Sequence, residues 1–220
     1  MNLANTQSRR GPASASRWAM VIDLRKCFGC RTCSVACAQQ NQTPEKFWRK
    51  VEELGLTRDG ECQRFFLPIS CMHCENPPCA SVCPTKATFQ RPDGIVEIDP
   101  ERCIGCGYCI LACPYRARTI YHRHLDFEID DHAPATDREG TCTKCNFCKD
   151  RIDAGLAAGL QPGSDMEATP ACVNNCSAGA LQFGDLNDPQ SNVSRLIREC
   201  RTLRLNPEHG TEPSVYYIIP

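Results

Sequence analysis

Large apolar side chains, which normally build a protein core, are scarce in this sequence. Of its 220 residues only 7% are aromatic, and the apolar share of 41% includes 19 cysteines. The aliphatic and aromatic core is therefore thinner than this share suggests, although apolar burial is the main driving force of folding. The length corresponds to about one to two domains. We expect that something other than apolar burial helps to hold this fold together.

The sequence also lacks long hydrophobic runs. No window approaches the ~20 apolar residues of a membrane-spanning helix, so we expect any membrane attachment to come through a partner. The segment 1–16 contains the pair Arg9-Arg10 but no apolar run of the length that a secretory signal needs. We interpret it as a flexible, solvated N-terminal tail and expect no export signal on this chain.

Neither an excess of one charge nor a catalytic motif is present. The formal net charge is -1, and acidic and basic residues are interspersed, which gives no footprint for nucleic acid. Serine, histidine and acidic residues are scattered without a catalytic arrangement. No C-x2-C pair is followed by histidine, so the attachment motif of a c-type haem is missing. These absences leave the cysteines as the main carriers of chemistry.

Most of the cysteines fall into four groups, and each group ends in C-x3-C. This shared ending is an internal repeat, which is typical of repeated structural units. In chain order the groups are Cys27, Cys30, Cys33 and Cys37; Cys71, Cys74, Cys79 and Cys83; Cys103, Cys106, Cys109 and Cys113; and Cys142, Cys145, Cys148, Cys172 and Cys176.

Three kinds of cysteine chemistry compete for these groups. Disulfides suit them poorly, because closely spaced cysteines close short loops and the stabilisation from a disulfide grows with loop length. Structural zinc sites use four ligands, usually as two well-separated pairs. Three thiolates in one tight loop, then a fourth after three intervening residues and a proline, match the run that binds [4Fe–4S] clusters in bacterial ferredoxins. The spacing therefore predicts iron–sulfur clusters.

The spacing also indicates how the thiolates of one group are shared. Two residues between successive cysteines let their sulfurs reach different irons of a cluster. Glycine lets the loop pass close to the cluster and adopt positive φ, which suits Gly29, Gly105 and Gly107. We expect the fourth cysteine about one turn along a following short helix, which Pro84 or Pro114 ends in two groups. In two-cluster ferredoxins this cysteine ligates the other cluster.

Short β-prone segments alternate with the cysteine groups. The stretch 87–99 predicts a β-hairpin, because Pro92-Asp93-Gly94 separates two β-prone runs. The stretch 191–205 has helical spacing with Ser191 as its N-cap. Further strands are predicted within 18–24, 64–70, 180–186 and 213–220.

Six motifs together cover nearly all of residues 17–220. They are “CFGCRTCSVAC”, “CMHCENPPCASVCPTKAT”, “GIVEIDPERCIGCGYCILACPYRAR”, “KCNFCKDRIDAGLAAG”, “TPACVNNCSAGALQFGDLNDP” and “GTEPSVYYIIP”. In this order they resemble the four-cluster electron-transfer (β) subunits of the dimethyl-sulfoxide-reductase superfamily. Ala38 and Ser177 stand where proline often follows the last cysteine, a departure that removes no ligand.

The resemblance implies that the first group pairs with the fourth and the second with the third, giving four [4Fe–4S] clusters. Cys106 stands where some relatives lack a cysteine and carry a three-iron cluster, so four cubanes are expected. The implied ligands are Cys27, Cys30, Cys33 and Cys176 for cluster 1; Cys145, Cys148, Cys172 and Cys37 for cluster 2; Cys71, Cys74, Cys79 and Cys113 for cluster 3; and Cys103, Cys106, Cys109 and Cys83 for cluster 4.

The fourth group contains one cysteine more than its clusters need. By spacing alone, the ligand pair is either Cys142 with Cys145 or Cys145 with Cys148, or all three bind. The resemblance places C-x2-C-x2-R on Cys145, Cys148 and Arg151, with a long insertion before Cys172. The cysteines left as non-ligands are then Cys62, Cys142 and Cys200.

The predicted fold class is α+β: two interleaved, bacterial-type double-cubane ferredoxin-like modules with short helices, small antiparallel sheets and long loops. The first module combines residues 17–60 and 138–190, which carry the first and fourth groups. The second spans 61–137, with the second and third groups. Residues 191–220 form a C-terminal helix and a docking extension.

The resemblance implies a non-catalytic subunit that relays electrons between a molybdenum or tungsten bis-pterin catalytic subunit and an integral-membrane quinone-reacting subunit. The substrate of such a complex would be a sulfur compound or phenylacetyl-CoA. We expect a peripheral position on a membrane-bound complex, with the cytoplasmic face favoured and export with a signal-bearing partner as the other possibility. The segments 43–63, 124–140 and 205–220 suit docking. The rival functions are a free-standing polyferredoxin and a zinc-stapled interaction module.

Polar side chains near the cysteine groups allow two interpretations. Basic residues either offset the negative clusters and raise their potentials or form ordinary solvated surface. His73 stands between two predicted ligands, but thiolates complete the ligand count, so we expect it to pack or to face solvent. The basic residues are Lys26, Arg31, Arg116, Arg118, Lys144, Lys149 and Arg151.

Overall fold

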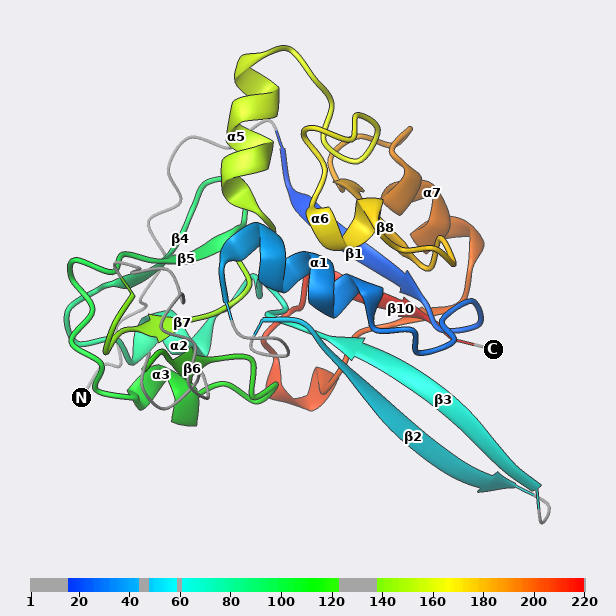
Figure 1. The fold of residues 1–220 in the computed structure, drawn as a ribbon, viewed down its shortest axis with the longest axis horizontal. Coiled ribbons are helices and arrows are strands. Elements are labelled where there is room, and N and C mark those ends of the chain that lie inside the picture. Colours follow the sequence, from blue (N-terminus) through cyan, green and yellow to red (C-terminus); the bar gives the residue numbers. More distant parts are fainter. Residues whose placement is uncertain (1–15, 44–47, 59–60, 123–137, 220) are drawn as a thin grey trace, which may run out of the picture.

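The computed structural model describes residues 16–43, 48–58, 61–122 and 138–219 (Figure 1). No helix in these ranges is long and apolar enough to cross a membrane. The tail at 1–16 and the docking segment at 124–140 lie almost entirely outside the described residues.

Its helices and strands are short, and the loops that carry cysteines separate them. In chain order they are β1 (Trp18–Asp23), α1 (Thr32–Asn41), β2 (Lys50–Arg58), β3 (Glu61–Ile69), α2 (Pro78–Ser81), β4 (Thr88–Gln90), β5 (Val96–Ile98), α3 (Tyr108–Leu111), β6 (Thr119–Ile120), β7 (Cys142–Thr143), α5 (Lys149–Ala157), α6 (Ala171–Asn174), β8 (Leu181–Asp185), α7 (Asn192–Glu199), β9 (Thr202–Leu203), the 3-10 helix η1 (Pro207–His209) and β10 (Val215–Ile218).

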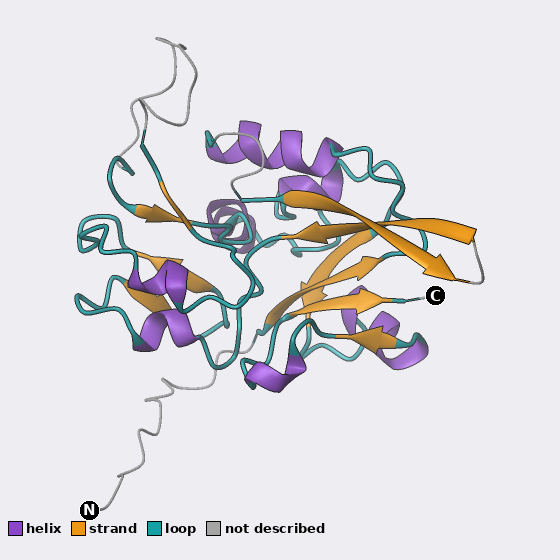
Figure 2. Cartoon of the chain, turned by 90° about the horizontal axis from the view of Figure 1, so that it is seen from below, coloured by secondary structure: helices purple, strands orange, loops and turns teal. Residues whose placement is uncertain are grey.

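Strand β1 is central in the four-stranded sheet, whose order is β8-β1-β10-β9. All of its residues are buried, and Met20 lies opposite Phe183 of β8 and Val215 of β10. Strands were predicted at all three places, and the structure confirms them. The pairing of β1 with β10 is parallel, which corrects the expectation of antiparallel sheets alone. The last described strand thus pairs with the first one. In Figure 2 the chain end marked C follows a strand that lies beside other strands.

Of the two hairpins described next, the sequence predicted one in full and the other only in part. The predicted hairpin at 87–99 is confirmed as β4–β5, with Gly94 at φ 87° in its turn. The long hairpin β2–β3 projects from the body of the molecule in Figure 1. Only its second strand was predicted, because the segment before it carries no clear period-two pattern. Its base is anchored where the Tyr217 hydroxyl donates to the Pro68 carbonyl oxygen at 2.9 Å.

The short helices carry different cysteines from those expected. In α2, α3 and α6 the helix carries Cys79, Cys109 or Cys172 and ends two residues before the last cysteine of the group. That last cysteine thus lies just beyond the helix, which corrects the predicted position within it. Helix α1 is the exception: it contains Cys37 and continues past it, because Ala38 can extend a helix where proline would end it.

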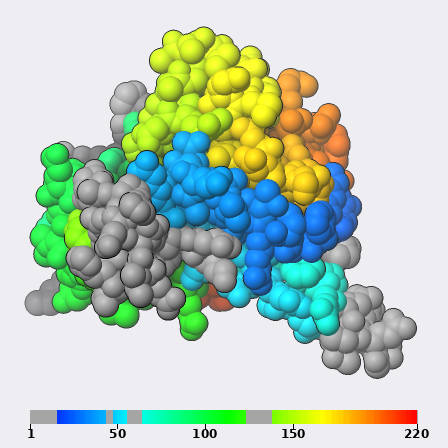
Figure 3. Space-filling model, in the orientation of Figure 1, coloured from blue at the N-terminus to red at the C-terminus, as the bar shows by residue number. Residues whose placement is uncertain are grey.

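The contacts between helices support the predicted pairing of cysteine groups. Helix α1 of the first group contacts α6 of the fourth, and β1 pairs with β8. In Figure 3 the blue segment with α1 lies against the yellow segment with α6. Helix α2 of the second group contacts α3 of the third, and β4 pairs with β5. The sheet β6–β7 links the two halves, and the division into two modules stays a prediction.

Helix α7 has the predicted N-cap, Ser191, whose hydroxyl accepts the backbone N–H of Ser194 at 3.2 Å. The helix ends at Glu199 and β9 follows, which corrects the helical spacing predicted as far as residue 205. Replacing this cap by alanine, Ser191→Ala, should lower the free energy of unfolding by about 1 kcal/mol. Denaturation of the cluster-loaded chain measures the loss. The control Ser164→Ala changes a serine that caps no helix and should stay within about 0.5 kcal/mol of wild type. Equal losses in the two variants would contradict the capping role.

Candidate metal centres

The exposure of the cysteine side chains follows the four predicted clusters. All four ligands predicted for cluster 2 are buried, as are three of the four for cluster 3. Predicted clusters 1 and 4 each include one exposed cysteine, Cys30 and Cys106 respectively. Two of the sites thus lie inside the protein and two reach its surface.

The structure brings the ligands of predicted cluster 1 together. The thiol of Cys27 interacts electrostatically with those of Cys30 and Cys176. Cys33 interacts with both Cys27 and Cys176. The Cys176 sulfur also accepts the backbone N–H of Ala180 at 3.2 Å.

The ligands of predicted cluster 2 converge in the same way. Cys37, on α1, interacts electrostatically with Cys145, Cys172 and Cys148, which come from the fourth group. The amide of Asn41 donates to the Cys148 sulfur at 3.7 Å. Two distant parts of the chain therefore meet at this site.

The ligands of predicted cluster 3 line one cavity. Its wall includes Cys71, Cys74, Cys79 and Cys113, together with the apolar residues around them and the side chain of Arg118. The four cysteines of predicted cluster 4 are joined less directly. Among the described residues no hydrogen bond links Cys83 to the third group, although α2 contacts α3.

Burial makes free thiolates costly in these sites. It raises the pKa of Cys33 to about 11 and that of Cys74 to about 12. It also raises the pKa of Cys145 to about 12 and that of Cys148 to about 11. These thiols are protonated at neutral pH unless a cation or metal compensates the charge. Iron binding would do so, because metal ligation requires the thiolate.

The loops share one backbone feature, which also bears on the ambiguous fourth group. The residue directly before the second ligand is left-handed in each group: Gly29, His73, Gly105 and, for the pair Cys145 and Cys148, Phe147. The predicted positive φ of Gly29, Gly105 and Gly107 is confirmed. If Cys142 and Cys145 were the pair, the corresponding residue would be Lys144, whose φ is not positive. The backbone thus supports the pair Cys145 and Cys148.

Cys142 lies apart from predicted cluster 2 and close to the third group. Its sulfur is 3.5 Å from the Cys109 sulfur, and its backbone N–H donates to the Cys103 sulfur at 3.4 Å. The hydrogen bond with Cys142 lowers the pKa of Cys109. Cys142 thus contacts two predicted ligands of cluster 4, Cys109 and Cys103, which supports its prediction as a non-ligand of cluster 2.

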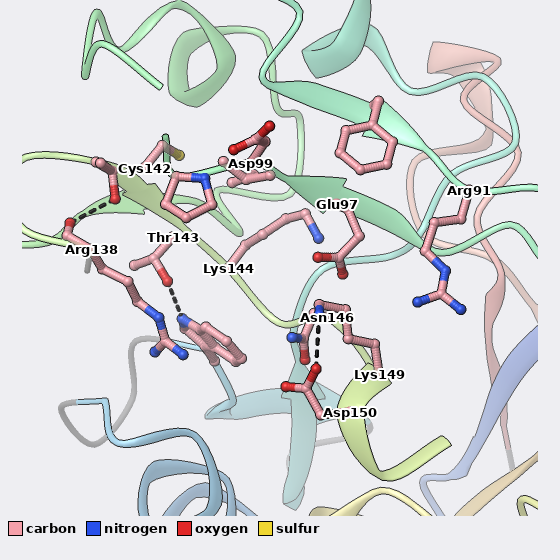
Figure 4. Close-up of a pocket in the computed structure, with 15 residues that line it drawn as sticks. Arg91, Glu97, Asp99, Arg138, Cys142, Thr143, Lys144, Asn146, Lys149 and Asp150 are labelled. Carbon is pink, nitrogen blue, oxygen red and sulfur yellow. Dashed lines mark hydrogen bonds and ion pairs between the residues drawn. The ribbon is translucent and has the colours of Figure 1, made fainter. Parts of the chain in front are cut away.

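The same segment borders a polar pocket of about 440 Å³ (Figure 4). Figure 4 shows Lys144 and Glu97 with their charged ends directed toward one another. The Lys144 ammonium donates to the carbonyl oxygens of Val96 and Cys145, the latter at 2.9 Å. Its role is thus structural, because it fixes the chain just before Cys145.

Arg151, the arginine of the C-x2-C-x2-R motif, forms hydrogen bonds with two other segments. Its Nε donates to the Thr169 carbonyl oxygen at 2.8 Å, and Nη1 donates to the Gln40 side chain at 3.1 Å. These bonds tie α5 to α1 and to the end of the insertion, three residues before Cys172. Of the other basic residues, Arg118 is buried, whereas Lys26, Arg31, Arg116 and Lys149 are exposed or half-exposed.

His73 packs in the interior, which is one of the two roles expected for it. It is fully buried, its Nδ1 accepts the Val96 N–H at 3.1 Å, and its ring stacks on Phe147 with 3.7 Å between centroids. Burial lowers the pKa of His73 well below its usual range, so the ring is neutral. The stack joins the loop of predicted cluster 3 to that of predicted cluster 2.

Sequence reasoning missed Arg49, which is buried among cysteine sulfurs. Its Nη2 lies 3.6 Å from the Cys172 sulfur, while Nε and Nη1 have no hydrogen-bond partner among the described residues. No cysteine group adjoins Arg49 in the sequence, so only the fold reveals its position. A buried cation without a counter-anion fits a site that holds a negatively charged cluster.

A single metal ion fits the described residues less well. Nowhere in the described ranges do three or more His, Cys, Asp or Glu side chains surround one ion position. A [4Fe–4S] cluster needs no such convergence, because each cysteine binds a different iron. The donor set of soft thiolates in tight loops suits iron–sulfur chemistry.

Comparisons with known proteins agree with the prediction of [4Fe–4S] clusters. A family model described as a 4Fe-4S dicluster domain matches residues 62–128. The B subunit of tetrathionate reductase from Salmonella typhimurium is 42% identical, over 92% of this chain and 72% of that protein. The B component of polysulfide reductase from Wolinella succinogenes is 37% identical, over 93% of this chain and 95% of that protein. Hdr-like menaquinol oxidoreductase iron-sulfur subunit 1 of Archaeoglobus fulgidus is 39% identical, over 91% of this chain and 82% of that protein.

The register of the fourth group can be tested with two serine variants. Cys142→Ser should keep the expected iron content of about 16 per chain, because Cys142 is a predicted non-ligand. Cys148→Ser should disrupt one cluster and lower the iron content by up to about 4. Iron analysis and electron paramagnetic resonance (EPR) spectra measure both. Intact iron in Cys148→Ser together with loss in Cys142→Ser would shift the register by three residues.

Removing the iron tests how much iron binding contributes to the stability of the fold. Several predicted ligands belong to the main core, so the iron-depleted chain should lose their bonds and show little cooperative thermal unfolding. Calorimetry of the loaded and depleted chains makes the comparison. A sharp transition in the depleted chain would show that the core is sufficient without metal.

Proposed function

Since this chain belongs to the family of iron–sulfur electron-transfer (β) subunits of the dimethyl-sulfoxide-reductase superfamily, we propose that it relays electrons between two partner subunits. One partner is a molybdenum or tungsten bis-pterin catalytic subunit, and the other is an integral-membrane quinone-reacting subunit. Bound [4Fe–4S] clusters supply one-electron transfer, with potentials set by charge, hydrogen bonds and burial.

The observation that carries this proposal is the graded exposure of the ligands. We propose that sixteen cysteines hold four clusters in the sets named above, as the interactions within predicted clusters 1, 2 and 3 support. Clusters 1 and 4, with the exposed Cys30 and Cys106, then form the two ends of a chain of sites. Clusters 2 and 3 form its buried middle.

Contacts between neighbouring sites support the order 1, 2, 3, 4. Cys33 of cluster 1 interacts electrostatically with Cys172 of cluster 2. Cys145 of cluster 2 interacts with Cys71 of cluster 3. Clusters 3 and 4 belong to the same predicted module, where α2 contacts α3. An electron that enters at one end can thus leave at the other without crossing solvent.

Exposed apolar side chains at both ends support docking of two partners. Phe28 and Val35 are exposed beside the ligands of cluster 1. Ile104, Tyr108 and Leu111 are exposed beside those of cluster 4, and Leu111 is 85% exposed. Apolar residues gathered on a surface are typical of protein interaction sites. A freely diffusing polyferredoxin, the alternative function, has no need of such faces.

The relatives bear on the reaction and on the location of the complex. Two of them are named for tetrathionate and polysulfide, so we propose a sulfur compound as the substrate in preference to phenylacetyl-CoA. A third is named as a menaquinol oxidoreductase subunit, which supports a quinone-reacting partner. We propose a peripheral position on the membrane-bound complex, at its cytoplasmic face.

Purification of the native complex tests this function. In mild detergent the chain should co-purify with a pterin-containing subunit and a membrane subunit, and it should carry about 16 irons. The identity of the catalytic subunit then fixes the substrate class. Recovery of the chain alone from a detergent-free soluble fraction, with all of its iron, would favour the polyferredoxin and overturn the proposal.

A further inference from the structure

Two arginine side chains are buried among the cysteines, one in each predicted module. Arg49, directly before β2, is 1% exposed, and Arg118, directly before β6, is 4% exposed. Burying a guanidinium is costly unless its charge is compensated. In the described part of the chain neither side chain forms an ion pair with a carboxylate, and each lies against sulfur atoms instead.

Arg49 lies within the first module. Its Nη2 is 3.0 Å from the Met20 sulfur and 3.6 Å from the Cys172 sulfur. Its Nε and Nη1 are buried without a hydrogen-bond partner among the described residues. The cysteines with which it interacts electrostatically are Cys172, Cys145, Cys33 and Cys37.

Arg118 occupies the corresponding position in the second module. Its Nη2 is 2.9 Å from the Cys79 sulfur, and its Nη1 donates to the Thr88 hydroxyl at 3.1 Å. The cysteines with which it interacts electrostatically are Cys79, Cys71, Cys142 and Cys109.

The proposed ligand sets place each guanidinium between two clusters. Of the cysteines around Arg49, Cys33 belongs to cluster 1 and the other three belong to cluster 2. Around Arg118, Cys79 and Cys71 belong to cluster 3, and Cys109 belongs to cluster 4. Each predicted module therefore holds one buried guanidinium between the ligands of its two proposed clusters.

We propose that Arg49 raises the reduction potentials of clusters 1 and 2, and that Arg118 raises those of clusters 3 and 4. Reduction adds one electron to a cluster that is already negative, so a nearby cation stabilises the reduced form more than the oxidised form. The effect is strong at these positions, because burial weakens screening by water. This inference rests on the proposed function and assigns to two residues a role in setting the potentials along the chain.

Redox titration of the purified, cluster-loaded complex, followed by EPR, tests the proposal. Single Cys→Ser variants of the ligands assign the signals to clusters beforehand. Arg49→Gln should lower the potentials of clusters 1 and 2 by about 59 mV, a tenfold change in the ratio of reduced to oxidised cluster, and leave clusters 3 and 4 unchanged. Arg118→Gln should produce the complementary pattern.

Two further variants distinguish the effect of the positive charge of Arg49 from that of its shape, and from the effect of removing any arginine. Arg49→Lys keeps the positive charge and should restore most of the wild-type potentials. Arg64→Gln removes the charge of an arginine that is 74% exposed on β3, and it should leave all four potentials unchanged. Equal shifts of all four clusters in Arg49→Gln, or potentials in Arg49→Lys as low as in Arg49→Gln, would overturn the proposal.

Iron content decides the outcome if the glutamine variant fails to assemble. Loss of iron in Arg49→Gln together with full iron in Arg49→Lys would show that the charge is required, in agreement with the proposal. Equal loss in both variants would show that the guanidinium shape is required, which contradicts it. Wild-type chain without about 16 irons would instead refute the proposed function itself.

Discussion

Bonds between cysteine thiolates and iron are the interaction on which this structure depends. The main core includes cysteines from several groups at positions that would hold leucine or valine in an ordinary domain. A buried thiol contributes less apolar area than these residues, so a core of free thiols gains less from burial than a core of leucine and valine. Iron converts the same positions into strong cross-links between distant parts of the chain. The short helices and strands can therefore remain short.

The arrangement of these cross-links also determines what the molecule can do. In the proposed ligand sets each cysteine group serves two clusters, so the covalent chain itself would fix the loops of neighbouring sites at short range. The ligands of predicted clusters 2 and 3 are mostly buried, while those of clusters 1 and 4 reach the surface beside apolar side chains. In the proposed complex the protein thus contributes spacing, insulation and local charge, and a partner subunit would carry out the chemistry of the substrate.

Local signals in the sequence identified much of this structure. Ser191 caps its helix as predicted, and Gly29 and Gly105 adopt positive φ, because capping and left-handed turns depend on neighbouring residues. The parallel pairing of β1 with β10 and the burial of Arg49 depend on segments that are far apart in sequence. No local pattern encodes them. The ligand sets came from the family resemblance, since spacing alone left the fourth group ambiguous.

The stack of His73 on Phe147 distinguishes the inner loops from the outer ones. Gly29 and Gly105 adopt the left-handed conformation without strain, whereas for a residue with a side chain it costs about 1–3 kcal/mol. In the inner loops the two strained residues face one another, and their rings pack together across the boundary between the modules. A change to either ring therefore disturbs the backbone of both inner loops, so the two predicted inner sites are coupled through this one contact.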